Sequence, residues 1–202
     1  VKLSTSTLKE KIGAGEYDGW DDPRVPTIKS LRRRGIRGQA IVDAMVELGT
    51  STSDVDLPIS NIYAHNRELV DDGTDRAFAV REGVRFEVAG GPGSAHPPVH
   101  PDHEDRGERD IPVGDSVMLE PDDVPEVGER VWLKGFGPFG REGDTLVYTD
   151  ESIDIVREKD VPVVHWVPTD GSVSVRMRTM DGDVACFAEP GIESYDEGDL
   201  LQ

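Results

Sequence analysis

The first third of the chain has the apolar spacing of helices. Apolar residues recur there every three to four positions, which places them on one face of a helix. The predicted helices cover residues 4–13, 26–34, 38–48 and about 57–70. Ser6 is the expected N-cap of the first helix, with Glu10 as its capping-box partner. Gly35 and Gly49 should end the second and third helices, because glycine readily adopts a left-handed C-cap conformation.

From about residue 76 the apolar period shortens to two, which is the spacing of half-buried strands. Residues 76–80 and 84–88 are predicted to form a hairpin across a short turn. Further strands are predicted over residues 116–120, 129–136, 145–150, 153–157, 161–167, 173–179 and 183–188. Helices followed by many short strands indicate an α+β fold, mainly β, with barrels rather than a parallel sheet.

Neighbouring residues of a strand point to opposite faces, and this applies to His165 and Trp166 in the strand predicted over residues 161–167. We therefore expect one of the two to pack in the core.

The chain is strongly acidic. Its 22 Lys and Arg stand against 41 Asp and Glu, which gives a formal net charge of −19 at pH 7. The acidic residues alternate with strand-like apolar residues instead of gathering in a tail, which favours a folded chain with an acidic surface over disorder. Such a lysine-poor acidic surface resembles proteins of salt-accumulating halophilic archaea, where high salt screens the repulsion. We hypothesise a halophilic source.

The same charge argues against nucleic acid as a partner, since a protein that contacts phosphates normally has a basic footprint. One group of residues has that character: Arg32, Arg33, Arg34 and Arg37. At molar salt, counterion release contributes little, so stacking and base-edge contacts would have to provide more of the binding. From charge alone, nucleic-acid binding is not expected.

Several classes of protein are excluded by what the sequence lacks. A single cysteine, Cys186, allows no internal disulfide, fits a reducing cytosol and is expected to be buried in a strand. No apolar run reaches the ~18 residues of a membrane-spanning helix, and no signal peptide is expected. A cytoplasmic location is therefore expected.

Two further patterns match known chemistry only in part. His96, His100 and His103 have no cysteine nearby and a spacing that fits no common zinc site, so no metal is expected. Gly135–Gly140 satisfies the GxGxxG pattern, but a strand follows it where a dinucleotide site needs a helix. We predict a hairpin loop there.

Two strings in the helical part resemble a known enzyme family. GWDDPR (Gly19–Arg24) and PTIKSLRRRGI (Pro26–Ile36) are similar to class I glutamyl-tRNA synthetases of the archaeal and eukaryotic type, and to glutaminyl-tRNA synthetases. The KMSKS motif of that family precedes this stretch and corresponds here to Lys2, Leu3, Ser4, Thr5 and Ser6. The first lysine and both serines match, whereas leucine replaces methionine and threonine replaces the second lysine. Later segments that resemble the family are Asn66–Arg67, Arg76–Val80 and His165–Val167.

The resemblance implies a helical subdomain over residues 1–75 and an anticodon-binding region over residues 76–202. In the family, this region has two β-barrels of the ribosomal-protein-like anticodon-binding type. The far barrel would cover about residues 127–188, and the near barrel, which starts at Arg76, would lack its closing strands. Because unpaired strand edges favour association, such a chain should be less stable or should self-associate.

By the same resemblance, the chain is a C-terminal part of a ligase that attaches glutamate to tRNA with ATP and Mg²⁺. The KMSKS-like residues would contact the ATP phosphates, and Arg32, Arg33, Arg34 and Arg37 would contact the tRNA backbone. The chain has no HIGH-like motif, the other half of the ATP site. We therefore expect it to have no catalytic residue, to be inactive alone and to hold no cofactor.

Two alternatives remain open. A glutaminyl-tRNA synthetase shares GWDDPR and the barrels, although the halophilic archaeal character favours the glutamate enzyme. The expected partners are therefore glutamate tRNA and also glutamine tRNA, with neither DNA nor a membrane. The other alternative is an acidic interaction module that has kept the fold and does not bind RNA.

Overall fold

The structure, a computed structural model, describes residues 4–49, 58–158, 160–196, 198–199 and 201. The chain forms two units, Val1–Thr74 with Arg178–Asp183, and Asp75–Met177 with Val184–Gln202. Lys2 and Leu3 of the KMSKS-like segment lie outside the described residues.

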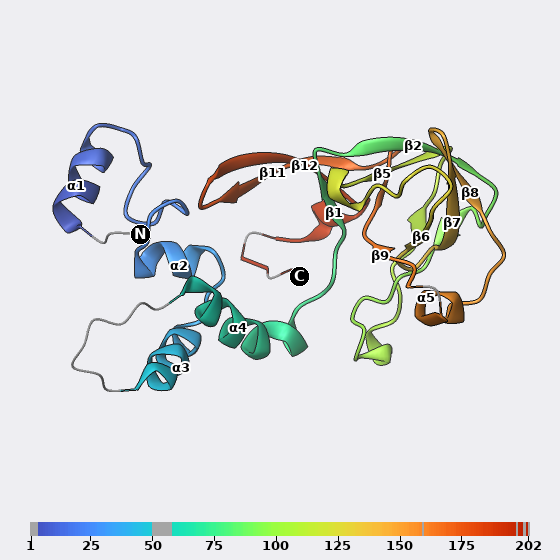
Figure 1. The fold of residues 1–202 in the computed structure, drawn as a ribbon. Helices are drawn as coiled ribbons and strands as arrows, with labels where there is room; N and C mark the ends of the chain where they lie inside the picture. Colours follow the sequence, from blue (N-terminus) through green and yellow to red (C-terminus); the bar gives the residue numbers. More distant parts are fainter. Residues whose placement is uncertain (1–3, 50–57, 159, 197, 200, 202) are drawn as a thin grey trace. The chain divides into compact units, whose positions relative to one another are not determined.

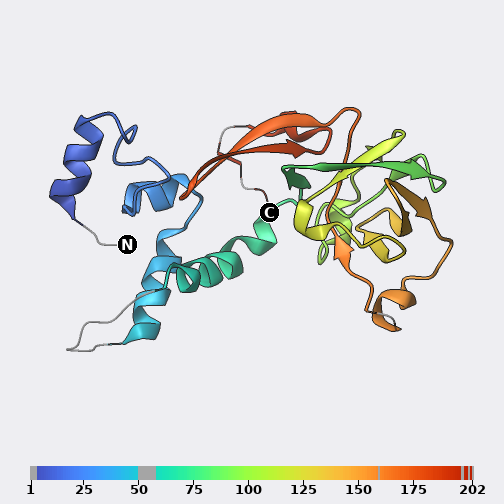
Figure 2. The same ribbon diagram turned by 45° about the horizontal axis from the view of Figure 1, so that its top comes forward.

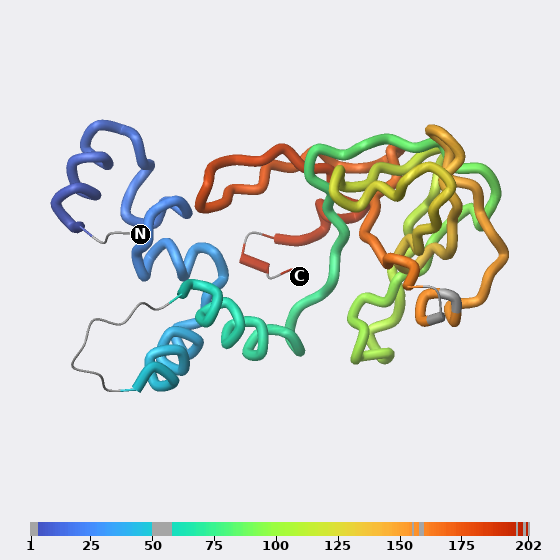
Figure 3. Tube along the Cα trace, viewed as in Figure 1, coloured from blue at the N-terminus to red at the C-terminus, as the bar shows by residue number. Residues whose placement is uncertain are grey.

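The first unit is helical, as its apolar spacing predicts (Figure 1). Its helices are α1 (Thr5–Gly13), α2 (Ile28–Arg33), α3 (Gly38–Leu48) and α4 (Ile59–Val70), followed by a short 3₁₀ helix at Asp71–Gly73. The core of this unit comprises Leu31, Ile36, Ala40, Ala44 and Ile62. Its two alanines are completely buried, and their small side chains let α3 lie close against α4 (Figure 3).

The predicted N-cap at Ser6 is wrong, because Ser4 caps α1. Ser4 has an extended backbone (φ −128°, ψ 109°), and its hydroxyl accepts a hydrogen bond from the Thr7 backbone N–H at 3.5 Å. An N-cap needs this non-helical conformation, whereas Ser6 already lies inside the helix. The helix ends predicted at Gly35 and Gly49 are confirmed, with φ angles of +80° and +67°.

The carboxylate of Asp22, which is completely buried, organises the loop between α1 and α2. It accepts hydrogen bonds from the backbone N–H groups of Asp18 and Arg24, both at 2.9 Å. The Arg24 guanidinium donates to both carboxylate oxygens, at 2.9 and 2.6 Å, and holds the pKa of the Asp22 carboxyl well below its usual range. Burial alone would raise this pKa, so the arginine and the amides outweigh the loss of solvation.

The second unit is built around a seven-stranded sheet. Its strands are β2 (Val84–Ala89), β5 (Ser116–Leu119), β6 (Arg130–Leu133), β7 (Gly137–Glu142), β8 (Thr145–Tyr148), β9 (Val163–Val164) and β10 (Val167–Pro168), in the spatial order β10-β5-β2-β8-β7-β6-β9. The outermost strands, β9 and β10, are the two ends of one segment, residues 163–168. Because this segment pairs with β6 at one end and with β5 at the other, it joins the two edges of the sheet. The predicted mainly β, barrel-like fold is confirmed.

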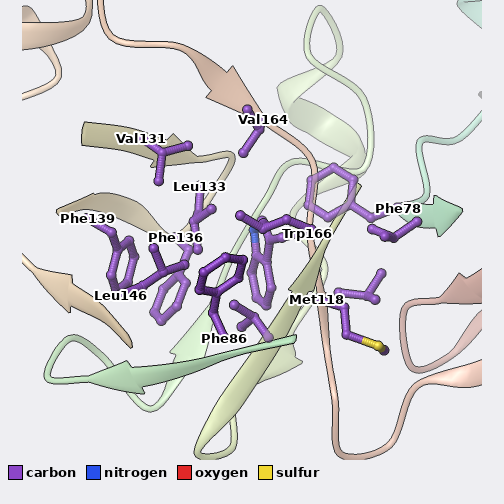
Figure 4. Packing of buried hydrophobic residues seen from close by; sticks show 14 of the residues in the cluster. Phe78, Phe86, Met118, Val131, Leu133, Phe136, Phe139, Leu146, Val164 and Trp166 are labelled. Carbon is purple, nitrogen blue, oxygen red and sulfur yellow. The ribbon is translucent and has the colours of Figure 1, made fainter. Parts of the chain in front are cut away.

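Trp166, in the middle of that segment, fills the interior of the curled sheet. It is completely buried, and its indole N–H donates to the Lys134 carbonyl at 3.0 Å. Figure 4 shows its ring among aromatic side chains, with centroids 5.0 Å from Phe136 and 6.5 Å from Phe78. The neighbouring His165 is exposed, so the expected opposite orientation of the pair is confirmed.

The remaining strands form two smaller sheets. Strands β1 (Ala79–Arg81), β11 (Val173–Thr179) and β12 (Gly182–Ala188) make a three-stranded sheet, in which β11 and β12 are a hairpin (Figure 2). Cys186 is buried in β12, as predicted. The other short elements are β3 (Ser94–Ala95), which pairs with β4 (Ile111–Pro112), the helix α5 (Asp154–Glu158), and 3₁₀ turns at Glu104–Arg106, Pro121–Asp123 and Ile192–Ser194.

The predicted hairpin of residues 76–80 with 84–88 is wrong. Strand β1 pairs with β12, about a hundred residues later, whereas β2 pairs with β5 and β8. Glu82, between them, has a positive φ of 50°, and the chain crosses there from one sheet to the other. Both segments contain strands, but long-range packing decides which strands pair.

Two further local predictions are wrong. Residues 153–157 are not a strand, because α5 starts there, with the Ser152 hydroxyl accepting from the Asp154 backbone N–H at 3.3 Å. Gly135–Gly140 is not wholly a hairpin loop, because β7 begins at Gly137 and pairs with β6 and β8. The glycines lead into β7 and β8, and not into the helix that a dinucleotide site needs.

Replacing Trp166 with alanine should lower the free energy of unfolding by about 3–5 kcal/mol, the range for truncating a large buried aromatic residue. Denaturant titration at constant KCl would measure this. Val163→Ala is the matched control, since Val163 lies on the same segment but is 48% exposed, and it should change stability by less than about 0.5 kcal/mol. Equal losses in the two variants would contradict the central role of Trp166.

Asp22→Asn should lower the free energy of unfolding by about 2–3 kcal/mol near neutral pH, because it leaves Arg24 without its carboxylate. The folded-state pKa of Asp22 lies below its ordinary 3.8, so the stabilisation is complete above that value and is lost as pH falls toward the folded-state pKa. The difference between the two proteins should therefore narrow below about pH 4. Denaturant titration across that pH range would measure the difference, with the exposed Asp21→Asn as the control variant. A difference in stability that does not change with pH would contradict the role given to the Asp22 carboxylate.

Candidate nucleic-acid interface

The described part of the KMSKS-like segment is the start of α1. Besides capping the helix, the Ser4 hydroxyl lies 3.1 Å from the hydroxyls of both Ser6 and Thr7. Thr5 and Ser6 are exposed. Hydroxyl groups at the positive end of a helix dipole provide surroundings that favour an anion.

The arginine turn, which we define as residues 32–37, links α2 to α3. It is a Schellman motif, in which the N–H of Gly35 bonds to the Arg32 carbonyl and the N–H of Ile36 to the Leu31 carbonyl, each at 3.0 Å. Gly35 supplies the left-handed conformation at the centre of the motif. Ile36 and Leu31 belong to the same buried cluster, which completes the apolar contact of this motif.

The turn exposes three of its four arginines: Arg32, Arg33 and Arg37. Arg33 lies 3.3 Å from the Asp21 carboxylate, and both side chains are about half exposed. Within the part of the chain that the structure describes, the side chains of Arg32 and Arg37 have neither a hydrogen bond nor an ion pair. Their charges are therefore open to an anionic partner.

Arg34, the fourth arginine, is half-buried. Its Nη1 donates to the Tyr63 hydroxyl at 2.7 Å, and its guanidinium carbon lies 5.8 Å from the centre of the Tyr63 ring. The Tyr63 hydroxyl in turn donates to the sulfur of Met180 at 3.4 Å. Arg34 therefore packs against α4, whereas the other three arginines project from the turn.

A second group, which consists of three positive side chains and two rings, lies in the other unit. We call it the Phe78 cluster: Arg76, Phe78, Arg109, Lys134 and His165. The Arg109 guanidinium carbon lies 4.7 Å from the centre of the buried Phe78 ring, and the His165 ring lies 5.3 Å from it. Protein atoms shield part of the exposed Lys134 side chain from water, which lowers its pKa, and the positive charges of Arg76 and Arg109 lower it further. The pKa of His165 is also lowered, first by partial loss of contact with water and then by the positive charge of Lys134.

One buried carboxylate, Glu189, anchors this cluster. It accepts a hydrogen bond from the Phe78 backbone N–H at 2.9 Å and lies 2.7 Å from Nε of Arg109. Burial raises the pKa of Glu189, and Arg109 opposes the shift. Arg109 thus has a carboxylate partner, while the exposed Lys134 has positive neighbours and remains available to an anion.

Sequence reasoning missed the Phe78 cluster, whose charged members come from segments up to 89 residues apart, from residue 76 to residue 165. Arg76, Phe78 and His165 each gave a signal, because they lie in segments that resemble the synthetase family, but nothing in the sequence indicated that these segments meet. Arg109 and Lys134 look like ordinary surface residues until β1 and the segment 163–168 bring them together.

Two other features of the described residues bear on function. No helix among them is both long and apolar enough to cross a membrane. Nor do three His, Cys, Asp or Glu side chains in that part of the chain gather as a ligand set for a metal. Nδ1 of the buried His100 accepts from the Asp102 backbone N–H at 3.1 Å, and its ring lies 4.5 Å from that of His103, so these histidines pack the loop.

Comparison with known proteins places these observations in a family. Residues 74–155 match the family described as tRNA synthetases class I (E and Q), anti-codon binding domain. The whole chain is 63% identical to a glutamate–tRNA ligase of Natronomonas pharaonis and 54% identical to those of Halobacterium salinarum and Haloarcula marismortui. It spans only 35–37% of the length of these relatives, which come from halophilic archaea. The chain therefore belongs to the class I glutamyl- and glutaminyl-tRNA synthetase family, and residues 74–155 match its anticodon-binding domain.

Proposed function

We propose that the chain is the tRNA-binding part of a glutamate–tRNA ligase. The observation that carries the proposal is the Phe78 cluster, a positive group whose Arg76, Arg109 and Lys134 lie within the range matched to the anticodon-binding domain. In a chain with a net charge of −19, such a local concentration of positive charge favours a partner that carries negative charge or hydrogen-bond acceptors. An RNA phosphate and the edge of a base are partners of this kind.

The arginine turn is the second contact of the proposal. Arg32, Arg33 and Arg37 would meet the backbone on the inner side of the tRNA, with Arg34 holding the turn against Tyr63. Arginine suits this role because its planar guanidinium can donate two parallel hydrogen bonds to one phosphate. The helical subdomain (residues 1–75) and the anticodon-binding region (residues 76–202) would thus hold different parts of the same RNA.

The parent enzyme would join glutamate to tRNA with ATP and Mg²⁺ in the cytoplasm, and the names of the relatives favour glutamate over glutamine. Lys2, Leu3, Ser4, Thr5 and Ser6 would contact the ATP phosphates. The exposed Thr5 and Ser6 suit this role, whereas the hydroxyl of Ser4 is engaged in capping α1. No residue of this chain is proposed to be catalytic. Glutamate tRNA is the proposed partner, with glutamine tRNA as a second substrate of a relaxed enzyme.

The chain should bind glutamate tRNA more tightly than an unrelated tRNA, and should lose affinity when the anticodon is changed. Lys134→Gln should weaken the cognate complex about tenfold, equal to about 1.4 kcal/mol, and reduce discrimination between anticodons. Fluorescence anisotropy in molar KCl would measure both. Lys9→Gln, an exposed lysine of α1, is the charge-matched control and should leave discrimination unchanged. Binding that ignores the anticodon in the unmodified chain would refute the proposed function.

The double variant Arg32→Ala/Arg37→Ala should weaken binding to every tRNA by a similar factor, because phosphate contacts carry no sequence information. The salt dependence should also change, with the slope of log K against log[KCl] falling in magnitude by about 2. Arg81→Ala/Arg85→Ala removes the same charge from arginines that already pair with Glu120 and Glu87. If that control changed the slope as much, the arginine turn would have no special part in binding.

A further inference from the structure

The arginine turn is held by a side chain from α4. The side-chain Oδ1 of Asn66 accepts a hydrogen bond from the backbone N–H of Arg37 at 2.8 Å. Its Nδ2 donates to the carbonyl of Gly35 at 3.3 Å. One amide group thus bridges two backbone groups on either side of Ile36.

The Schellman motif itself pairs neither of these two backbone groups. The motif uses the carbonyls of Leu31 and Arg32, and the N–H groups of Gly35 and Ile36. Arg37 then serves as the N-cap residue of α3, with no hydrogen bond from a capping side chain. Asn66 therefore supplies partners for two backbone groups where α2 has ended and α3 has not yet begun.

Tyr63 and Asn66 are three residues apart, so they lie on the same face of α4. Tyr63 holds the side chain of Arg34, and Asn66 holds the backbone between Gly35 and Arg37. The two ends of the Asn66 amide are already engaged, whereas the next residue, Arg67, is exposed. The helix thus fixes the turn at two points.

We propose that Asn66 is a positioning residue for RNA binding, which fixes the backbone of the arginine turn so that Arg32 and Arg37 meet phosphates together. This inference rests on the proposed function. A turn that is already ordered loses less conformational entropy when RNA binds, so its arginines contribute more to affinity. Asn66 acts through the arginines and makes no RNA contact itself.

The test is a double-mutant cycle in the 202-residue chain, with tRNA affinity as the readout. Asn66→Ala should weaken binding of glutamate tRNA about fivefold when Arg32 and Arg37 are present. In the Arg32→Ala/Arg37→Ala background, the same substitution should change affinity by less than about twofold, because the two arginines through which Asn66 acts are absent. His65→Ala is the matched control, because His65 lies beside Asn66 on α4 but contacts Glu47 of α3 at 3.0 Å.

A second readout separates positioning from a general loss of stability. Amide hydrogen exchange of Arg37 should accelerate in Asn66→Ala, while exchange in the core of α3 and α4 stays as in the unmodified chain. The same exchange pattern in His65→Ala would overturn the assignment. So would an Asn66→Ala variant that binds tRNA as tightly as the unmodified chain, or that loses equal affinity in both backgrounds.

The outcomes also distinguish this inference from the function on which it rests. If the unmodified chain binds no tRNA while it is folded, the proposed function fails and the positioning role fails with it. If the unmodified chain binds, and Arg32→Ala/Arg37→Ala weakens it while Asn66→Ala does not, only the role of Asn66 is refuted.

Discussion

A phosphate that approaches this chain meets a surface whose formal net charge is −19, and that repulsion constrains how an RNA can be bound. Uniform positive charge, the usual solution of RNA-binding proteins, is not available here. Binding would instead depend on a few cations. Among the described residues, Arg32 and Arg37 of the arginine turn have no carboxylate partner, and the charges that lower the pKa of Lys134 in the Phe78 cluster are positive.

The arginines of the molecule fall into two groups by the partners that hold them. Arg24, Arg81 and Arg178 pair with carboxylates, so their charge is neutralised locally and their role is to fix loops and strands. At the two candidate contacts, neutral groups hold some of the positive side chains, although Arg33 lies beside Asp21 and Arg109 pairs with Glu189. Arg34 packs on Tyr63, Arg109 lies over Phe78 in addition to pairing with Glu189, and the backbone at Arg37 is held by Asn66. Order without neutralisation keeps charge available for a ligand.

The parts of the fold that local chemistry determines could be predicted from the sequence. The four helices, the left-handed glycines at 35 and 49 and the opposite orientation of His165 and Trp166 all follow from spacing and from residue type. What could not be predicted is which strands pair. Strand β1 selects β12, and residues 163–168 join β5 to β6, because burial of Trp166 and Phe78 depends on residues far apart in sequence. The Phe78 cluster depends on that pairing, so it was missed for the same reason.

High salt changes how much each kind of contact contributes to stability and to binding. At about 1 M salt the Debye length is about 3 Å, so exposed pairs such as Arg33 with Asp21 lose most of their attraction. The contacts that shape the two candidate sites are of another kind: a Schellman turn, an asparagine amide, ring faces and a buried carboxylate. Hydrogen bonds and apolar packing persist when charges are screened, and concentrated salts of some kinds strengthen burial. Salt should therefore weaken the attraction between RNA and these arginines without removing the geometry that presents them, and selectivity would come from that geometry.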